Sequence, residues 1–111
     1  MAQSVDDFLQ ECCLLIDRRL VDPFTNDKDN KATLNLLGYS IKALLEELKD
    51  LESKDLFRGP NPDRSSKHPG DVWEFKKVIQ GHLIYIKLKI RIFDSGKRKD
   101  LFVMSFHPDR P

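Results

Sequence analysis

The residues best suited to chemistry lie in the C-terminal half, in a stretch that reads HLIYIKLKIRIF over residues 82–93. Successive side chains of a strand point to opposite faces, so one face of this stretch is aliphatic and the other carries a tyrosine and three cations. The residues of the polar face are Tyr85, Lys87, Lys89 and Arg91. A strand face that only had to be exposed to solvent could use serine, threonine or glutamate. A purely cationic face therefore indicates an anionic partner.

Two further side chains make this face a candidate for RNA cleavage. Cleavage without a metal needs a base for the 2′-hydroxyl proton, an acid for the leaving 5′-oxygen, and cations for the charge that grows around phosphorus. Glu74 and His107 are the predicted base and acid, in either order, and Tyr85 could stack a base or transfer a proton. The cations predicted to supply the positive field are Arg58, Arg64, Lys76 and Lys87.

Each of these residues also has a structural interpretation. A histidine at a strand end is usually a surface residue, alternating lysines often form a solvated face that discourages aggregation, and Glu74 beside Lys76 could be a cross-strand ion pair. His68, His82 and His107 lack metal-ligand spacing, and the sequence has neither a glycine-rich phosphate loop nor a serine nucleophile elbow. We therefore expect neither a metal nor a cofactor.

Chain length and charge distribution limit the number of domains and indicate where a basic patch lies. The 111 residues fit a single domain over residues 1–111, and the net charge of +1 hides an asymmetry. Residues 1–53 hold 6 Lys and Arg against 11 Asp and Glu, a balance of −5, whereas residues 54–111 hold 13 against 7, a balance of +6. A basic patch that attracts phosphate is therefore expected in the C-terminal half.

The cellular compartment follows from the cysteines and the N-terminal stretch. Cys12 and Cys13 are adjacent and have no other cysteine to pair with, which fits a reducing compartment. The first ten residues are acidic and lack the regions of a secretion signal, and no apolar run reaches membrane-spanning length. The sequence predicts a cytoplasmic protein without a membrane partner.

The N-terminal half predicts helices. Ser4 followed by two aspartates predicts a helix from about Val5 to Cys13, while the following CLLIDRRL is open between the last helical turns and a short edge strand. Residues 21–31 are predicted to be a loop. A short helix from Lys31 is predicted to stop at Gly38, and Ser40 is predicted to cap the next helix.

The C-terminal half predicts strands. After a loop over residues 57–71, three alternating runs with turns at QG and DSGKRKD predict an antiparallel meander, so the fold class is α+β, with helices packed on one face of a twisted antiparallel sheet. If Ile84, Ile86 and Leu88 face the helices, the side chains expected to join them are Trp73, Phe75, Phe102, Met104 and Phe106. The side chains expected on the open face are Glu74, Lys76, Tyr85, Lys87, Lys89, Ser105 and His107.

Four segments in this order resemble the MqsR-type toxins, mRNA interferases of bacterial toxin–antitoxin systems with a RelE-like fold. The segments are LFRGPNPDR, GDVWEF, GHLIYIKLKI and FVMSFHPD, and the resemblance extends over roughly residues 31–109. It implies ribonuclease activity on mRNA, growth inhibition and neutralisation by a cognate antitoxin. The family's catalytic positions fall on Arg58, Glu74, Tyr85 and His107. Only Tyr85 keeps the family's residue type, and the glutamate and histidine change the proton chemistry.

Three functions stay open at this point. The first is a metal-independent endoribonuclease toxin with the catalytic set Arg58, Glu74, Tyr85 and His107. The second is a sheet that binds RNA or the ribosome without cutting, and the third is a surface that receives an acidic segment of the antitoxin. The predicted RNA-binding residues are Arg64, Lys76, Lys87, Lys89 and Arg91. Strong salt dependence without cleavage would favour the second function.

Overall fold

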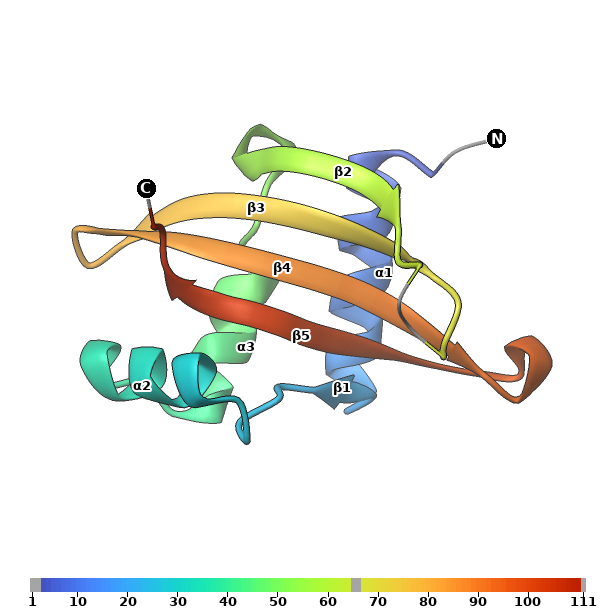
Figure 1. Cartoon of the computed structure of the whole chain (residues 1–111), viewed down its shortest axis with the longest axis horizontal. Coiled ribbons are helices and arrows are strands. Elements are labelled where there is room, and N and C mark those ends of the chain that lie inside the picture. The colour runs from blue at the N-terminus through green and yellow to red at the C-terminus, as the bar shows by residue number, and fades with distance from the viewer. Residues whose placement is uncertain (1–2, 65–66, 111) are drawn as a thin grey trace.

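The computed structural model describes residues 3–64 and 67–110, and it confirms the α+β class. Helices precede most of the sheet along the chain (Figure 1). The helices are α1 (Val5–Asp17), α2 (Lys28–Leu37) and α3 (Ile41–Lys49), with short 3₁₀ turns at η1 (Ser53–Asp55) and η2 (Asp94–Gly96). The strands are β1 (Val21–Asp22), β2 (Leu56–Pro62), β3 (Asp71–Ile79), β4 (His82–Phe93) and β5 (Arg98–Pro108).

The strand order in the five-stranded sheet is β1-β5-β4-β3-β2. Neighbouring strands from β2 to β5 are antiparallel, whereas β1 pairs in parallel with β5 through Val21 and Leu101 (Figure 1). The sheet is therefore mixed and is not a simple meander, which corrects the expectation of a purely antiparallel sheet. The first strand of the chain lies against the last one, a pairing that local alternation cannot reveal.

The helix boundaries follow their capping residues. Ser4 Oγ accepts a hydrogen bond from the Asp7 amide at the start of α1, as predicted. The helix continues to Asp17, four residues beyond the predicted end, because Leu15 and Ile16 extend its buried stripe. The open CLLIDRRL segment thus supplies the last turns of the helix, and the edge strand starts only at Val21.

The next two helices show the same capping chemistry. Asp27 caps α2 and places its start at Lys28, so the predicted loop over residues 21–31 is wrong at both ends. Gly38 ends α2 in the left-handed region with φ 68°, and Ser40 accepts a hydrogen bond from the Ala43 amide at the start of α3. Both of these boundaries were predicted.

The predicted loop over residues 57–71 is wrong in its first half. Residues 56–62 form β2, which pairs with β3 at the edge of the sheet. Pro60 and Pro62 led to the prediction of a loop, because proline has no backbone N–H to donate. Proline is nevertheless tolerated in an edge strand, where one side of the backbone makes no hydrogen bonds to a neighbouring strand. The pairing is also irregular, with register shifts on both sides of Arg58.

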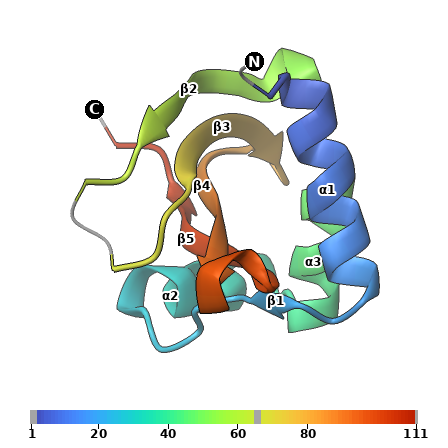
Figure 2. The same cartoon turned by 90° about the vertical axis from the view of Figure 1, so that its right-hand side faces the viewer.

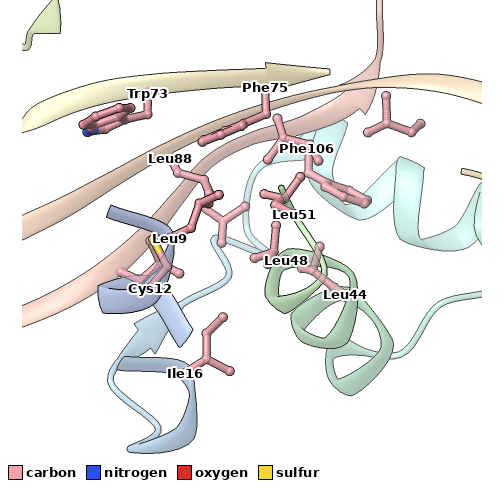
Figure 3. Packing of buried hydrophobic residues seen from close by; sticks show 14 of the residues in the cluster. Leu9, Cys12, Ile16, Leu44, Leu48, Leu51, Trp73, Phe75, Leu88 and Phe106 are labelled. Atoms are coloured by element: carbon pink, nitrogen blue, oxygen red, sulfur yellow. The ribbon is translucent and has the colours of Figure 1, made fainter. Parts of the chain in front are cut away.

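The core lies between one face of the sheet and the helices, with α1 and α3 side by side against it (Figure 2). Phe8 of α1 stacks on Trp73 with ring centroids 4.6 Å apart, and Leu44 and Leu48 of α3 point toward the same apolar cluster (Figure 3). The buried aromatic rings of β3 and β5 include Phe75 and Phe106 (Figure 3). Burying this face directs the polar side chains of the central strands away from the helices.

The face assignment is correct on β3 and β4 but wrong for part of β5. Phe106 is buried as predicted, whereas Phe102 and Met104 are not, and Leu101 and Val103 occupy the core in their place. The cause is a shift in register between β4 and β5, which inserts one extra residue and reverses the alternation. The Phe102 ring instead packs under the Arg91 guanidinium, 4.2 Å from its centroid.

Candidate functional site

The four predicted catalytic residues come together on the open face of the sheet, one from each of four neighbouring strands. Arg58 of β2 pairs in register with Glu74 of β3, and Tyr85 of β4 pairs with His107 of β5. Lys87 of β4 is the register partner of Glu74. Cross-strand neighbours on one face have Cβ atoms about 5 Å apart, so these five side chains form one cluster. We call Arg58, Glu74, Tyr85, Lys87 and His107 the open-face cluster.

Glu74 is the centre of the open-face cluster. Arg58 donates from Nε to Oε2 at 2.8 Å and from a terminal nitrogen to Oε1 at 3.2 Å, and the Tyr85 hydroxyl also donates to Oε1. Burial, with the residue only 7% exposed, raises the pKa of Glu74, but the hydrogen bonds from Arg58 and Tyr85 outweigh it, and the net pKa is lowered. The carboxylate is therefore ionised at neutral pH and is a weak base.

Tyr85 is held as a proton donor. Burial raises the pKa of its phenol, and the hydrogen bond to the Glu74 carboxylate raises it further. The phenol thus keeps its proton at neutral pH and donates it to Glu74. The same bond fixes the orientation of the ring, which lies beside the His107 ring with centroids 5.2 Å apart and an interplanar angle of 33°.

His107 is the member of the open-face cluster whose side-chain type exchanges protons most readily near neutral pH. Its Nδ1 lies 2.9 Å from the Pro108 carbonyl oxygen. A carbonyl oxygen can only accept, so this contact is a hydrogen bond when Nδ1 carries the proton, and Nε2 then keeps its lone pair. In the neutral ring, the contact thus favours the tautomer that carries its proton on Nδ1 and leaves Nε2 as the proton acceptor.

Phe57 is a neighbour of the open-face cluster that the sequence analysis missed. The ring is 48% exposed, the Lys76 Nζ lies 3.9 Å from its centroid, and the Arg58 guanidinium carbon lies 5.1 Å from it. The register shift between Leu56 and Arg58 places Phe57 at an irregularity of β2. Its aromatic type beside Arg58 was the available signal, but the loop prediction hid it.

Three of the predicted RNA-binding cations are not part of the open-face cluster. Lys89 is 1% exposed and donates to Asp63 Oδ2 at 3.0 Å and to the His68 carbonyl at 2.6 Å, so it is enclosed and cannot meet RNA in this structure. Arg91 donates to Asp100 and Asp22, away from the open-face cluster. Arg64 is exposed, and no described contact joins it to the cluster.

The remaining predicted cation, Lys76, lies on the same face as the open-face cluster and next to it. Its Nζ forms an ion pair with Asp109 at 3.1 Å in addition to its contact with the Phe57 ring. The structural alternative of an ion pair between Glu74 and Lys76 is not observed, because Glu74 pairs with Arg58 and Lys76 with Asp109. Lys76 is thus held at the rim of the cluster.

The lowered pKa of Glu74 predicts a specific dependence of stability on pH. The unfolded carboxyl binds protons below its ordinary pKa of about 4.3, and the folded one binds them only at lower pH, so the pairing stabilises the fold above that value. As the pH falls through the folded pKa, this contribution is lost. We expect the urea midpoints of wild type and Glu74→Gln to differ at pH 7 and to converge below about pH 4. A difference that does not change with pH would contradict the pairing.

Comparison with known proteins gave no match to a family model, to a curated protein or to a solved structure. No helix in the described part of the chain is long and apolar enough to cross a membrane. Within residues 3–64 and 67–110, no three His, Cys, Asp or Glu side chains are grouped so that they could hold a metal ion.

Proposed function

We propose that the protein is a metal-independent endoribonuclease, a toxin of a toxin–antitoxin system that cleaves mRNA in the cytoplasm and is neutralised by a cognate antitoxin. The observation that carries the proposal is the open-face cluster, in which a histidine, an arginine, a lysine and an ordered tyrosine–glutamate pair meet on one solvent-facing surface. The resemblance to MqsR-type toxins supports the same reaction, because its catalytic positions are four members of this cluster.

The geometry favours a revised division of roles. His107 Nε2 accepts the proton of the 2′-hydroxyl, the O2′–P bond forms and the P–O5′ bond breaks, and the imidazolium returns the proton to the leaving 5′-oxygen. The products are a 2′,3′-cyclic phosphate and a free 5′-hydroxyl. Glu74, as an ionised carboxylate with both oxygens engaged, is a positioning residue for Arg58 and Tyr85 and not the base.

The cations have room to bind phosphate. The Arg58 side chain is 60% exposed, and a guanidinium has five N–H donors, so it can hold a phosphate oxygen while it remains bonded to Glu74. Lys87 lies in register between Glu74 and Ser105 on the same face. The exposed Phe57 ring beside these cations fits an unstacked base next to the bound phosphate.

The test is incubation of the purified protein with end-labelled mRNA in EDTA, first without and then with ribosomes. We expect cuts that leave cyclic phosphate and 5′-hydroxyl ends. Ribosome dependence would appear as cleavage in the second arm alone. Without cleavage in either arm the proposal fails, and RNA binding that persists in that case would identify a non-catalytic binding module.

Lys87 is expected to contact RNA directly, whereas the enclosed Lys89 is not. Each phosphate contact on single-stranded RNA contributes about 0.7 to the slope of log K against log salt concentration. Lys87→Gln should therefore reduce the slope by about that amount, and Lys89→Met should leave it unchanged. Fluorescence anisotropy with labelled RNA over a salt series measures both slopes. Equal slopes for wild type and Lys87→Gln would place the RNA elsewhere.

A further inference from the structure

The register of β5 depends on one extra residue. Lys87 pairs with Ser105, and the next residue, Leu88, pairs with Val103, so Met104 has no partner in β4. This β-bulge lets Val103 and Phe106 both face the core while His107 faces out. In a regular strand they could not all do so, because a slip of one residue moves every following side chain to the other face. The bulge therefore decides on which side of the sheet His107 lies.

A single buried amide contacts β5 on both sides of the bulge. Asn30 of α2 is 1% exposed, its Oδ1 accepts a hydrogen bond from the Phe106 amide at 2.8 Å, and its Nδ2 donates to the Val103 carbonyl at 3.2 Å. Nδ2 also lies 3.4 Å from the carbonyls of Pro23 and Phe24. The side chain thus bridges the backbone across Met104.

This arrangement suits what a bulge requires. The extra residue interrupts the regular ladder, and buried backbone groups beside it are costly unless they find partners. A carboxamide offers the same donor and acceptor as a peptide unit, so one side chain can bond both the Phe106 amide and the Val103 carbonyl beside the bulge. The Asp27 side chain caps the start of α2 by accepting a hydrogen bond from the backbone N–H of Asn30 at 3.0 Å. This bond holds the backbone of Asn30 in place.

We propose that Asn30 is a positioning residue that locks the bulge at Met104 and thereby holds His107 beside Tyr85 on the open face. The value of this alignment for RNA cleavage rests on the proposed function. The effect of Asn30 on the position of the His107 ring does not, and it can be measured on the folded protein without RNA.

The experiment compares wild type, Asn30→Leu, a deletion of Met104, and the deletion combined with Asn30→Leu. Removing Met104 restores simple alternation, with Val103 and Phe106 inward and His107 outward, so the lock is no longer needed. We expect Asn30→Leu to lower Tm by on the order of 10 °C in the full-length chain and to weaken the nuclear Overhauser contacts between the Tyr85 and His107 rings. In the deletion background the same substitution should leave Tm unchanged or raise it, with the ring contacts present.

Two results would overturn the proposal. An equal fall in Tm in both backgrounds would mean that Asn30 only supports the segment before α2, through Pro23 and Phe24. Unchanged ring contacts in Asn30→Leu would mean that it does not position His107. If Asn30→Leu fails to fold, Asn30→Asp keeps the acceptor for Phe106 and removes the donor to Val103, and its ring contacts decide. Failure of wild type to cut RNA would refute the proposed function and leave these readouts intact.

Discussion

Replacing His107 with alanine is expected to reduce the rate of RNA cleavage by a hundredfold or more while RNA affinity stays nearly unchanged. General acid–base groups contribute on the order of 10² to 10⁴ in rate, and in the proposed reaction His107 serves as both base and acid. The side chain is partly exposed and lies outside the core, so its removal should not unfold the protein. Single-turnover rates on end-labelled RNA and anisotropy on an uncleavable 2′-deoxy analogue separate the two effects.

Ser105→Ala is the matched control for this substitution. Ser105 lies on the same strand and the same face as His107, and it is assigned no part in the chemistry. We expect its cleavage rate to stay within a few fold of wild type. If His107→Ala also cuts at that rate, the proton transfers belong to another group. If it loses RNA affinity in proportion to rate, His107 is a binding residue.

Lys89→Ala is expected to lower the free energy of unfolding by about 3–5 kcal/mol, although the residue lies on a strand that reads as a solvated cationic face. The ammonium is enclosed and holds Asp63 and the His68 carbonyl against the sheet. Gly70, at the end of the same segment, has φ 141° and lies so close to Ile90 that a Cβ would collide with its carbonyl oxygen. Truncation of Lys89 removes the cation from a tightly packed site. Urea denaturation followed by circular dichroism measures the loss.

Two further variants serve as controls for the predicted loss of stability in Lys89→Ala. Lys87→Ala, two residues away on the same strand, should change stability by less than about 0.5 kcal/mol, since surface substitutions usually do. The double substitution Lys89→Met with Asp63→Leu replaces both charges with apolar groups and should cost less than Lys89→Ala. A cost below about 1 kcal/mol for Lys89→Ala would show that the buried ion pair contributes little.

Much of the fold was predictable from local chemistry. Ser4, Gly38 and Ser40 mark helix ends because a side-chain oxygen or a left-handed glycine satisfies the backbone groups at a terminus, and such signals act within a few residues. The features that were missed depend on distant partners. β1 exists because β5 lies beside it, and β2 is an edge strand whose prolines hid it.

In the candidate site, too, the features set by local alternation could be predicted, and those set by distant partners could not. The open-face cluster could be predicted because alternation on β3 and β4 is regular and burial of one face fixes the other. The fate of Lys89 could not, because alternation places a side chain on a face and does not show which loop covers that face. The pairing that lowers the pKa of Glu74 could not be predicted for a similar reason. That pKa is set by Arg58, which lies on a strand that the sequence had hidden.

The parallel pairing of β1 with β5 also sets when the sheet can be completed during translation. β1 leaves the ribosome before the other strands and β5 leaves after them, so the edge that β1 covers does not exist until β5 has been made. The same late strand brings His107 to the open face. A nascent chain that ends before β5 therefore carries Arg58, Glu74 and Tyr85 without His107. Under the proposed function, a chain would therefore be unable to cut RNA until β5 has been made.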